Sequence, residues 1–174
     1  TSGGAMVLPG CEVLVPKQRA VIDAARTAGA PVIWLHDSHR KGMRREREFL
    51  KRTPHCIEGS WGVEIVAELD ARADDIHVIK HRYSAFFQTD LDLVLKDMLI
   101  DQLVIFGVVT NICVRSTVHD AFFLGYDVVV PADACAATGA VVKRTKGVVV
   151  QPVEIVERER RVHRAREIGG HCAG

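Results

Sequence analysis

Apolar residues recur at the spacing of one helix face in four parts of the chain. Pro16 and Gly29 suit the first turn and the end of the first of these helices. Ser60 is expected to cap the second helix, and Thr89 to cap the third with Asp92 as its capping-box partner. The pattern therefore predicts helices over 16–28, 61–69, 91–98 and 114–124.

Short, continuous apolar runs separate these helices and predict buried β-strands. A helix followed closely by a strand is typical of βαβ units, which form parallel sheets. With 174 residues and no internal repeat, the chain is expected to form one α/β domain with a substantial core. The expected strands cover 31–35, 76–79, 102–106, 126–130 and 147–150.

Composition excludes several classes of function. The formal net charge is +1, so there is no bulk attraction to nucleic acid. No apolar run approaches the roughly 20 residues of a membrane span, and the first ten residues do not have the pattern of a signal peptide. The five cysteines are scattered without a CxxC pair, which favours a reducing cytoplasm over a disulfide framework.

Cys113 occupies a position suited to a nucleophile. It follows the expected strand over 102–106 and a turn with Gly107, and it precedes the expected helix over 114–124. The free N–H groups and the dipole of a helix N-terminus favour thiolate over thiol and could stabilise an oxyanion. The alternative is that Cys113 is a small, buried and inert residue.

Polar residues stand at the carboxyl ends of two other expected strands, where ligands gather in parallel sheets. Lys80 ends the strand over 76–79, so its charge either reaches solvent or takes part in chemistry. Asp37 and His39 follow the strand over 31–35. The basic segment 40–47 is interpreted as a solvated loop or short helix, with a subunit contact or an anionic-substrate gate as alternatives.

Three separated segments together resemble the isochorismatase-like cysteine hydrolases, which include nicotinamidases, N-carbamoylsarcosine amidohydrolases, ureidoacrylate amidohydrolases and isochorismatases. The segments are KHRYSAF at 80–86, GVVTNICV at 107–114 and VPADAC at 130–135. The resemblance runs from about residue 3 to 138. It implies a three-layer α/β/α fold with a mostly parallel sheet of about six strands, in a single domain over 1–174.

The resemblance also assigns roles to residues. It implies an Asp–Lys–Cys triad in which Cys113 is the nucleophile and Lys80 the lysine. It implies a cis peptide bond between Val108 and Val109, and an oxyanion hole formed by the N–H groups of Val109 and Cys113. Cys113 would form a thioester with an amide or ureido carbonyl and release ammonia.

One part of the family pattern has no counterpart. The family's catalytic aspartate ends a first strand ahead of the Gly3-Gly4 loop, but the earliest aspartate here is Asp23, in an expected helix. The favoured interpretation is that the sequence lacks its N-terminal strand, and the alternative is a degenerate member. The segment after Thr138 also fits the family poorly.

The resemblance extends to a metal site and a substrate pocket. Asp37, His39 and His55 match the positions at which nicotinamidases bind zinc or a similar divalent ion. Many members lack a metal, so no cofactor is expected to be required. Core packing is the alternative for the aromatic members of the expected pocket, which comprises Trp61, Tyr83, Phe86, Phe87, Thr110 and Asn111.

The sequence thus predicts a cytoplasmic hydrolase that cleaves a small amide, carbamoyl or ureido compound. The form of segment 80–87 favours carbamoyl and ureido substrates, and Cys113 argues against an isochorismatase. The alternatives are a silent member that binds small molecules or acts as a scaffold, and a metal-dependent nicotinamidase. The expected partners are a small-molecule substrate and identical subunits in a dimer or tetramer, with neither nucleic acid nor membrane.

Overall fold

The strands pair in parallel, as the alternation of helices and strands predicts. The computed structural model describes residues 4–43 and 45–138, so the expected strand over 147–150 lies outside the described residues. Within them, hydrogen bonds join six strands into three parallel pairs. These are β1 (Ile33–Asp37) with β2 (Ile76–Lys80), β3 (Gln102–Val104) with β5 (Asp127–Val129), and β4 (Gly107–Val108) with β6 (Cys135–Ala136).

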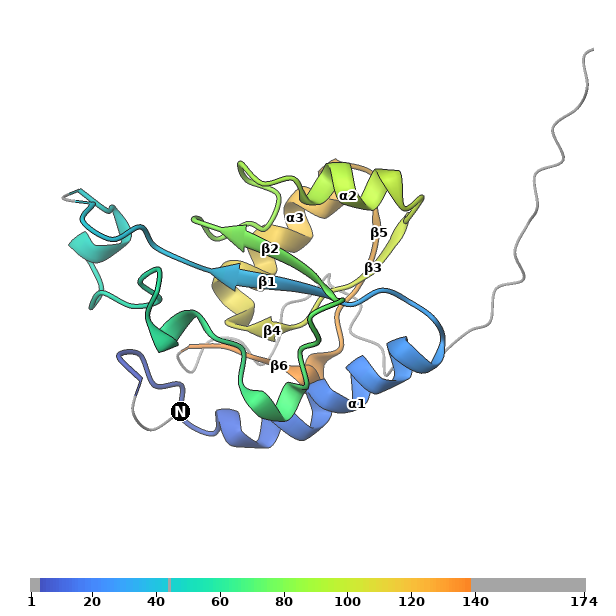
Figure 1. Ribbon diagram of the computed structural model, residues 1–174, viewed down its shortest axis with the longest axis horizontal. Coiled ribbons are helices and arrows are strands. Elements are labelled where there is room, and N and C mark those ends of the chain that lie inside the picture. The colour runs from blue at the N-terminus through green and yellow to red at the C-terminus, as the bar shows by residue number, and fades with distance from the viewer. Residues whose placement is uncertain (1–3, 44, 139–174) are drawn as a thin grey trace, which may run out of the picture.

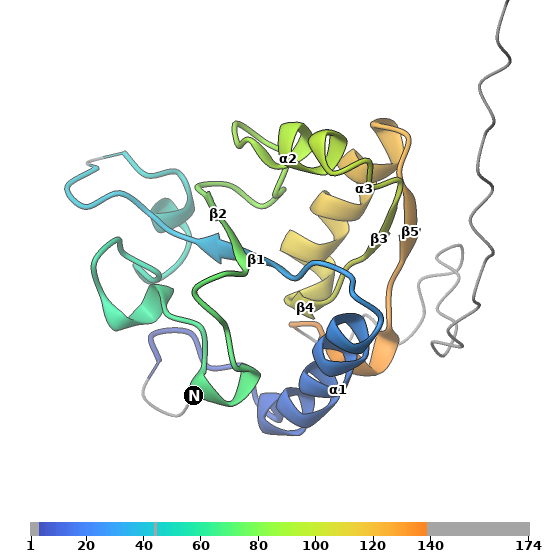
Figure 2. The same cartoon turned by 45° about the vertical axis from the view of Figure 1, so that its right-hand side comes forward.

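Three α-helices cover the strands. Helix α1 (Leu14–Thr27) lies on one side of them, and α2 (Leu91–Asp97) and α3 (Arg115–Phe123) lie on the other (Figures 1 and 2). These helices confirm three of the four predicted segments to within one or two residues. Shorter 3-10 helices cover Cys11–Val13, Glu48–Leu50, Trp61–Val63, Ala67–Leu69 and Ala132–Ala134, and a π-helix covers Thr110–Val114.

The core lies between the strands and the pair α2 and α3. Leu95 of α2 and Ala121 of α3 are almost fully buried and pack in one cluster with Val78 of β2. Phe86 packs against this cluster and stacks on Tyr126, with 5.8 Å between ring centroids. This packing fixes the carboxyl end of β2 and the loop after it beside α3.

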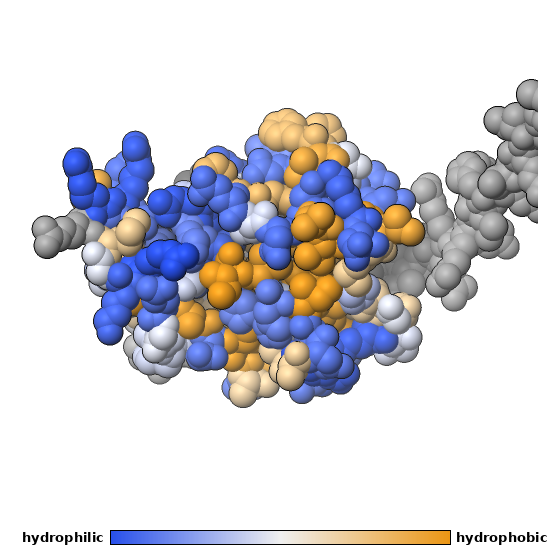
Figure 3. All heavy atoms as spheres, turned by 45° about the horizontal axis from the view of Figure 1, so that its top comes forward, coloured by the Kyte–Doolittle hydropathy of each residue, from blue (hydrophilic) through white to orange (hydrophobic). Residues whose placement is uncertain are grey.

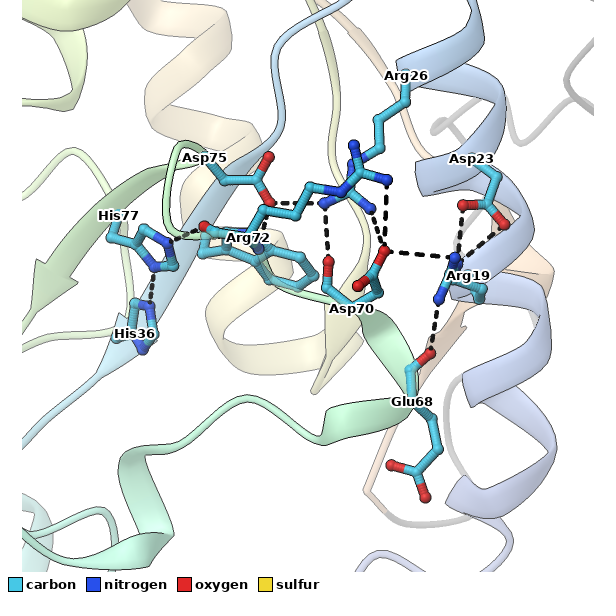
Figure 4. A network of polar contacts seen from close by, with 10 residues as sticks. Arg19, Asp23, Arg26, His36, Glu68, Asp70, Arg72, Asp75 and His77 are labelled. Atoms are coloured by element: carbon cyan, nitrogen blue, oxygen red, sulfur yellow. Dashed lines mark hydrogen bonds and ion pairs between the residues drawn. The ribbon is translucent and has the colours of Figure 1, made fainter.

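A polar network ties α1 to the first strand pair (Figure 4). The carboxylate of Asp75 accepts hydrogen bonds from the Trp34 indole at 2.8 Å and from Arg26 of α1 at 2.7 Å. Burial acts to raise the pKa of Asp75, but these bonds and the backbone N–H of Arg72 hold it below its ordinary value. Asp75 is therefore an ionised anchor between α1 and β1.

The predicted helix over 61–69 is wrong. Two 3-10 turns occur there, separated by extended backbone at Glu64 and Val66. Gly62 and three β-branched residues in this segment weaken an α-helix. The Ser60 hydroxyl donates to the carbonyl of Ile57 and does not cap a helix.

The predicted capping box before α2 does not form, because the N-cap residue is Asp90, one position after Thr89. The hydroxyl of Thr89 accepts the N–H of Leu91 at 3.3 Å. Asp92 does not complete the box, because its carboxylate accepts bonds from Lys96 at 2.6 Å and from the Tyr126 hydroxyl at 2.8 Å.

Apolar side chains reach the surface in several places, and Figure 3 shows groups of them between polar residues on one face. Phe122 and Phe123 at the end of α3 are 72% and 76% exposed. A second copy of the chain could cover such rings, so the predicted dimer or tetramer stays a prediction. No helix in the part of the chain that the structure describes is long and apolar enough to cross a bilayer.

Candidate active site

The site begins with two charged residues at the ends of neighbouring strands. Asp37 and Lys80 are register partners, the last residues of β1 and β2. The Lys80 ammonium lies 2.9 Å from Oδ1 of Asp37, and the residue is only 4% exposed. Lys80 therefore does not extend to solvent, and Asp37 offsets the cost of burying its charge.

Cys113 lies against this ion pair. It belongs to the π-helix that links β4 to α3, and its Sγ is 3.7 Å from Nζ of Lys80. The remaining donor of the ammonium reaches the carbonyl of Arg82 at 3.0 Å. The Lys80 ammonium thus donates to a carboxylate, a carbonyl and the thiol sulfur. These contacts fix the ammonium next to the sulfur.

A buried threonine fixes the backbone at the thiol. The hydroxyl of Thr117 donates to the carbonyl of Cys113 at 2.8 Å and accepts the N–H of Ala85 at 3.1 Å. Thr117 is 3% exposed, so both bonds are shielded from water. The loop after β2 and the turn that carries Cys113 are therefore joined by a single side chain.

The acidity of Cys113 differs from the sequence expectation. Burial raises the pKa of the thiol above its ordinary value, the Lys80 ammonium lowers it in opposition, and the Asp37 carboxylate adds to the rise. Burial and the Asp37 carboxylate thus act against the thiolate, and Lys80 acts in its favour. Neither burial nor the position of Asp37 can be read from the sequence around Cys113.

The backbone turn that precedes the thiol matches the family pattern. The peptide bond between Val108 and Val109 is cis, as the family resemblance implies. Val109 precedes the π-helix that contains Cys113. Backbone N–H groups next to a nucleophile suit an oxyanion, and this role of Val109 and Cys113 stays a prediction.

Three residues that could hold a metal ion, one of which is Asp37, lie close together. The ligand atoms of Asp37, His39 and His55 all lie within 4.8 Å of one another. Backbone bonds from His39 to Cys56 and Glu58 bring the two histidines together. Nδ1 of His55 lies 2.8 Å from the carbonyl of Thr53, so this nitrogen holds the proton and Nε2 keeps its lone pair.

The donor set fits a divalent ion. His39 is 4% exposed, and neither of its ring nitrogens has a hydrogen-bond partner among the described residues. Buried polar atoms without partners are costly, and a cation would satisfy one of them. Two imidazoles and one carboxylate are ligands that zinc accepts, with positions left open for water or substrate.

Sequence reasoning missed two glutamates, Glu46 in the basic segment and Glu48 directly after it. Glu46 is 5% exposed, with its carboxylate 3.7 Å from Nδ1 of His39 and 3.4 Å from Nη1 of Arg82. Burial acts to raise its pKa, but the backbone N–H of Glu48 and the neighbouring Arg82 and His39 side chains hold it below its ordinary value. The interpretation of a solvated loop is wrong for Glu46. An acidic residue inside a run of arginines was the available signal.

Glu48, at the start of the 3-10 helix Glu48–Leu50, links that helix to the loop after β2. Its carboxylate accepts the hydroxyl of Tyr83 and lies 3.1 Å from Nε of Arg52. This hydrogen bond, then burial, raises the pKa of Tyr83. The negative charge of Glu48 also adds to the raised pKa of Cys113, after burial and Asp37.

The other predicted pocket residues lie in different environments. Phe86 is partly buried and packs against the core cluster, the alternative that the sequence left open. Asn111 bonds through both its amide nitrogen and its oxygen to Thr138, at 3.3 and 3.2 Å. Trp61 is 64% exposed and Phe87 51% exposed, so contact with a substrate stays a prediction for these rings and for Thr110.

Comparisons with known proteins agree with this arrangement. The family model of the Isochorismatase domain matches residues 3–147. The ureidoacrylate amidohydrolase RutB of Serratia proteamaculans is 34% identical over an alignment that covers 80% of this chain and 65% of the relative. The chain thus spans just under two thirds of the length of that relative.

Two solved structures show the same similarity in three dimensions. The N-carbamoylsarcosine amidase from Thermoplasma acidophilum superimposes with a TM-score of 0.71 at 35% identity, covering 78% of this chain and 76% of the other. The pyrazinamidase/nicotinamidase from Streptococcus mutans superimposes with a TM-score of 0.69 at 30% identity, covering 74% and 75%.

Proposed function

The chain belongs to the isochorismatase family, and from this premise we propose that it is a cysteine-dependent hydrolase of non-peptide C–N bonds. The observation that carries the proposal is the chain of contacts from Asp37 through Lys80 to Cys113, at 2.9 and 3.7 Å. The Asp37 carboxylate already offsets the buried charge of Lys80, so the contact between Lys80 and the sulfur is not needed for stability. The ammonium is instead suited to stabilising a thiolate at Cys113. We also propose, from membership of the family, that the three strand pairs belong to one mostly parallel sheet between two helical layers.

In this proposal Cys113 is the nucleophile. Its sulfur attacks the carbonyl carbon of the substrate as the thiol proton leaves, and Lys80 stabilises the negative charge on sulfur. The N–H groups of Val109 and Cys113 face the carbonyl oxygen as it becomes negative. The C–N bond then breaks, ammonia leaves with the transferred proton, and a thioester remains. Water cleaves the thioester and restores the thiol.

Asp37 is the carboxylate that we assign to proton transfer in this chain. It lies against Lys80, and its field reaches Cys113, since it contributes to the raised pKa of that thiol. Positioned acid–base groups contribute about 10²–10⁴-fold to rate.

Carbamoyl or ureido compounds are the substrate class that we favour. Both the ureidoacrylate amidohydrolase and the N-carbamoylsarcosine amidase are named for such groups. The oxygen atoms of the Tyr83–Glu48 pair, in the loop after β2 and the 3-10 helix Glu48–Leu50, are acceptors that would suit the N–H donors of a carbamoyl or ureido group. An amide such as that of a nicotinamidase substrate would use fewer of them.

A second candidate is a metal-dependent amidase like the nicotinamidase relative. The cluster of Asp37, His39 and His55 supports it, as do the unpartnered nitrogens of His39. We propose that these three residues hold a divalent ion such as zinc. When bound, the ion would polarise a carbonyl or a water molecule. His55 and His39 contribute neutral imidazoles, and Asp37 shares its carboxylate between this cluster and Lys80.

Ammonia release from a panel of carbamoyl, ureido and simple amide compounds tests the proposal. Wild-type protein should release ammonia from at least one class, and Cys113→Ser should lose nearly all of this activity. Cys11→Ser is a matched control, because Cys11 lies in the short 3-10 helix before α1 and makes no hydrogen bond to Lys80. Binding without turnover across the panel would instead support a silent binding protein.

A further inference from the structure

His39 is a buried imidazole held between two carboxylates. Its Nε2 is 3.9 Å from Oδ2 of Asp37, and its Nδ1 is 3.7 Å from Oε2 of Glu46. Both distances are too long for hydrogen bonds, and both nitrogens lack partners among the described residues. The ring also packs against Phe49 and His55, with centroids 4.7 and 5.1 Å away.

The two nitrogens have different neighbours, and this assigns their roles. A neutral imidazole has one N–H and one lone pair, and only the lone pair can hold a cation. Nε2 faces Asp37, which belongs to the metal cluster with His55. Nδ1 must then carry the proton, and Glu46 is the carboxylate that lies on its side.

Neighbouring groups hold Glu46 on the Nδ1 side of His39, where its carboxylate can accept a hydrogen bond from Nδ1–H. Its side chain is 4% exposed, which is rare for a glutamate without a structural or functional reason. The backbone N–H of Glu48 reaches its Oε1 at 3.4 Å, and Nη1 of Arg82 lies 3.4 Å from each oxygen. These contacts keep the carboxylate beside the ring.

We propose that Glu46 is a positioning residue: from its place 3.7 Å away it accepts the Nδ1–H of His39 when a divalent ion binds Nε2 beside Asp37. Metal-binding histidines commonly donate their second N–H to a carboxylate, which fixes the tautomer and raises the basicity of the ligand. This inference rests on the metal site proposed above. It adds a residue from the basic segment that touches neither the ion nor the thiol.

The test measures zinc affinity of the full chain after chelator treatment, by competition with a fluorescent zinc chelator. Glu46→Gln should weaken the Kd by about 10–100-fold, the usual effect of losing such a partner. Glu58→Gln is the matched control, because Glu58 lies near His39 in the backbone ladder but its carboxylate bonds to Lys41 and Arg40. It should leave the Kd within about twofold of wild type.

A double-mutant cycle separates positioning from general damage to the fold. In a His39→Ala background, Glu46→Gln should have no further effect on the zinc Kd. An equal loss in both backgrounds would mean that Glu46 is only structural and would overturn the inference, as would a Glu46→Gln Kd equal to that of the control. If wild type binds zinc no more tightly than His39→Ala, the metal proposal itself fails, and the role of Glu46 fails with it. The visible spectrum of bound cobalt provides a second readout, which should change in Glu46→Gln but not in Glu58→Gln.

Discussion

Replacing Lys80 by methionine should slow the reaction of Cys113 with an alkylating reagent at neutral pH. The ammonium lies 3.7 Å from the sulfur. At an effective dielectric constant of about 20, two unit charges at that distance attract by about 4.5 kcal/mol. Relaxation of the site around the new side chain would reduce this value. Since about 1.4 kcal/mol corresponds to tenfold, we expect alkylation about 10–1,000-fold slower.

The assay follows iodoacetamide modification of each cysteine by peptide mass across a range of pH. Lys17→Met is the matched control, because Lys17 is exposed and pairs only loosely with Asp133 at 4.0 Å. The variant Lys80→Met with Asp37→Asn removes both charges of the buried pair, so it keeps the reading interpretable where Lys80→Met alone unfolds. A Cys113 rate within twofold of wild type in folded Lys80→Met protein would refute the role of Lys80.

Three further predictions concern stability. Asp75→Asn should lower the free energy of unfolding at pH 7 by about 1.5–3 kcal/mol, because charged hydrogen bonds are lost. The folded-state pKa of Asp75 is lowered, so its stabilisation is present above the unfolded pKa of about 3.9 and lost as pH falls below it; urea melts from pH 7 to 3 should therefore converge for the two proteins, and a constant difference would contradict this. Thr117→Val leaves the N–H of Ala85 unpaired and should lower the free energy of unfolding by about 1–3 kcal/mol, and kcat should fall by a larger factor than KM changes. An unchanged urea melt would show that the bond is not needed. Leu95→Ala should cost about 2–5 kcal/mol in the same assay, while the exposed Leu93→Ala stays within about 0.5, and equal effects would place the core elsewhere.

The sequence pattern was sufficient for the elements that carry the site. Apolar runs located β1 and β2 within two residues, and Asp37 and Lys80 fall at their carboxyl ends. Parallel pairing follows from alternation of helices and strands, and it brings those two side chains together. The helix after Cys113 was recognisable from its local residue types. Gly107 was expected in a turn and instead begins the short strand β4, and Cys113 lies within a π-helix that the pattern did not predict.

Contacts between distant segments were not predictable from the pattern. Periodicity cannot show that Glu46 turns inward from a basic segment to meet His39 and Arg82. It also cannot separate an aromatic residue of a pocket from one that packs against the core, as Phe86 does. The raised pKa of Cys113 depends on burial and on the position of Asp37, which are properties of the folded chain.

The central claim is that Cys113 forms a covalent thioester during turnover. Wild-type protein should be mixed with the carbamoyl or ureido compound that yields the most ammonia, quenched in acid within milliseconds to seconds, and digested for peptide mass analysis. The account predicts an added acyl mass on the Cys113 peptide alone, removed by hydroxylamine and absent from Cys113→Ser. Ammonia release by Cys113→Ser at the wild-type rate, with no added mass on any cysteine, would contradict it.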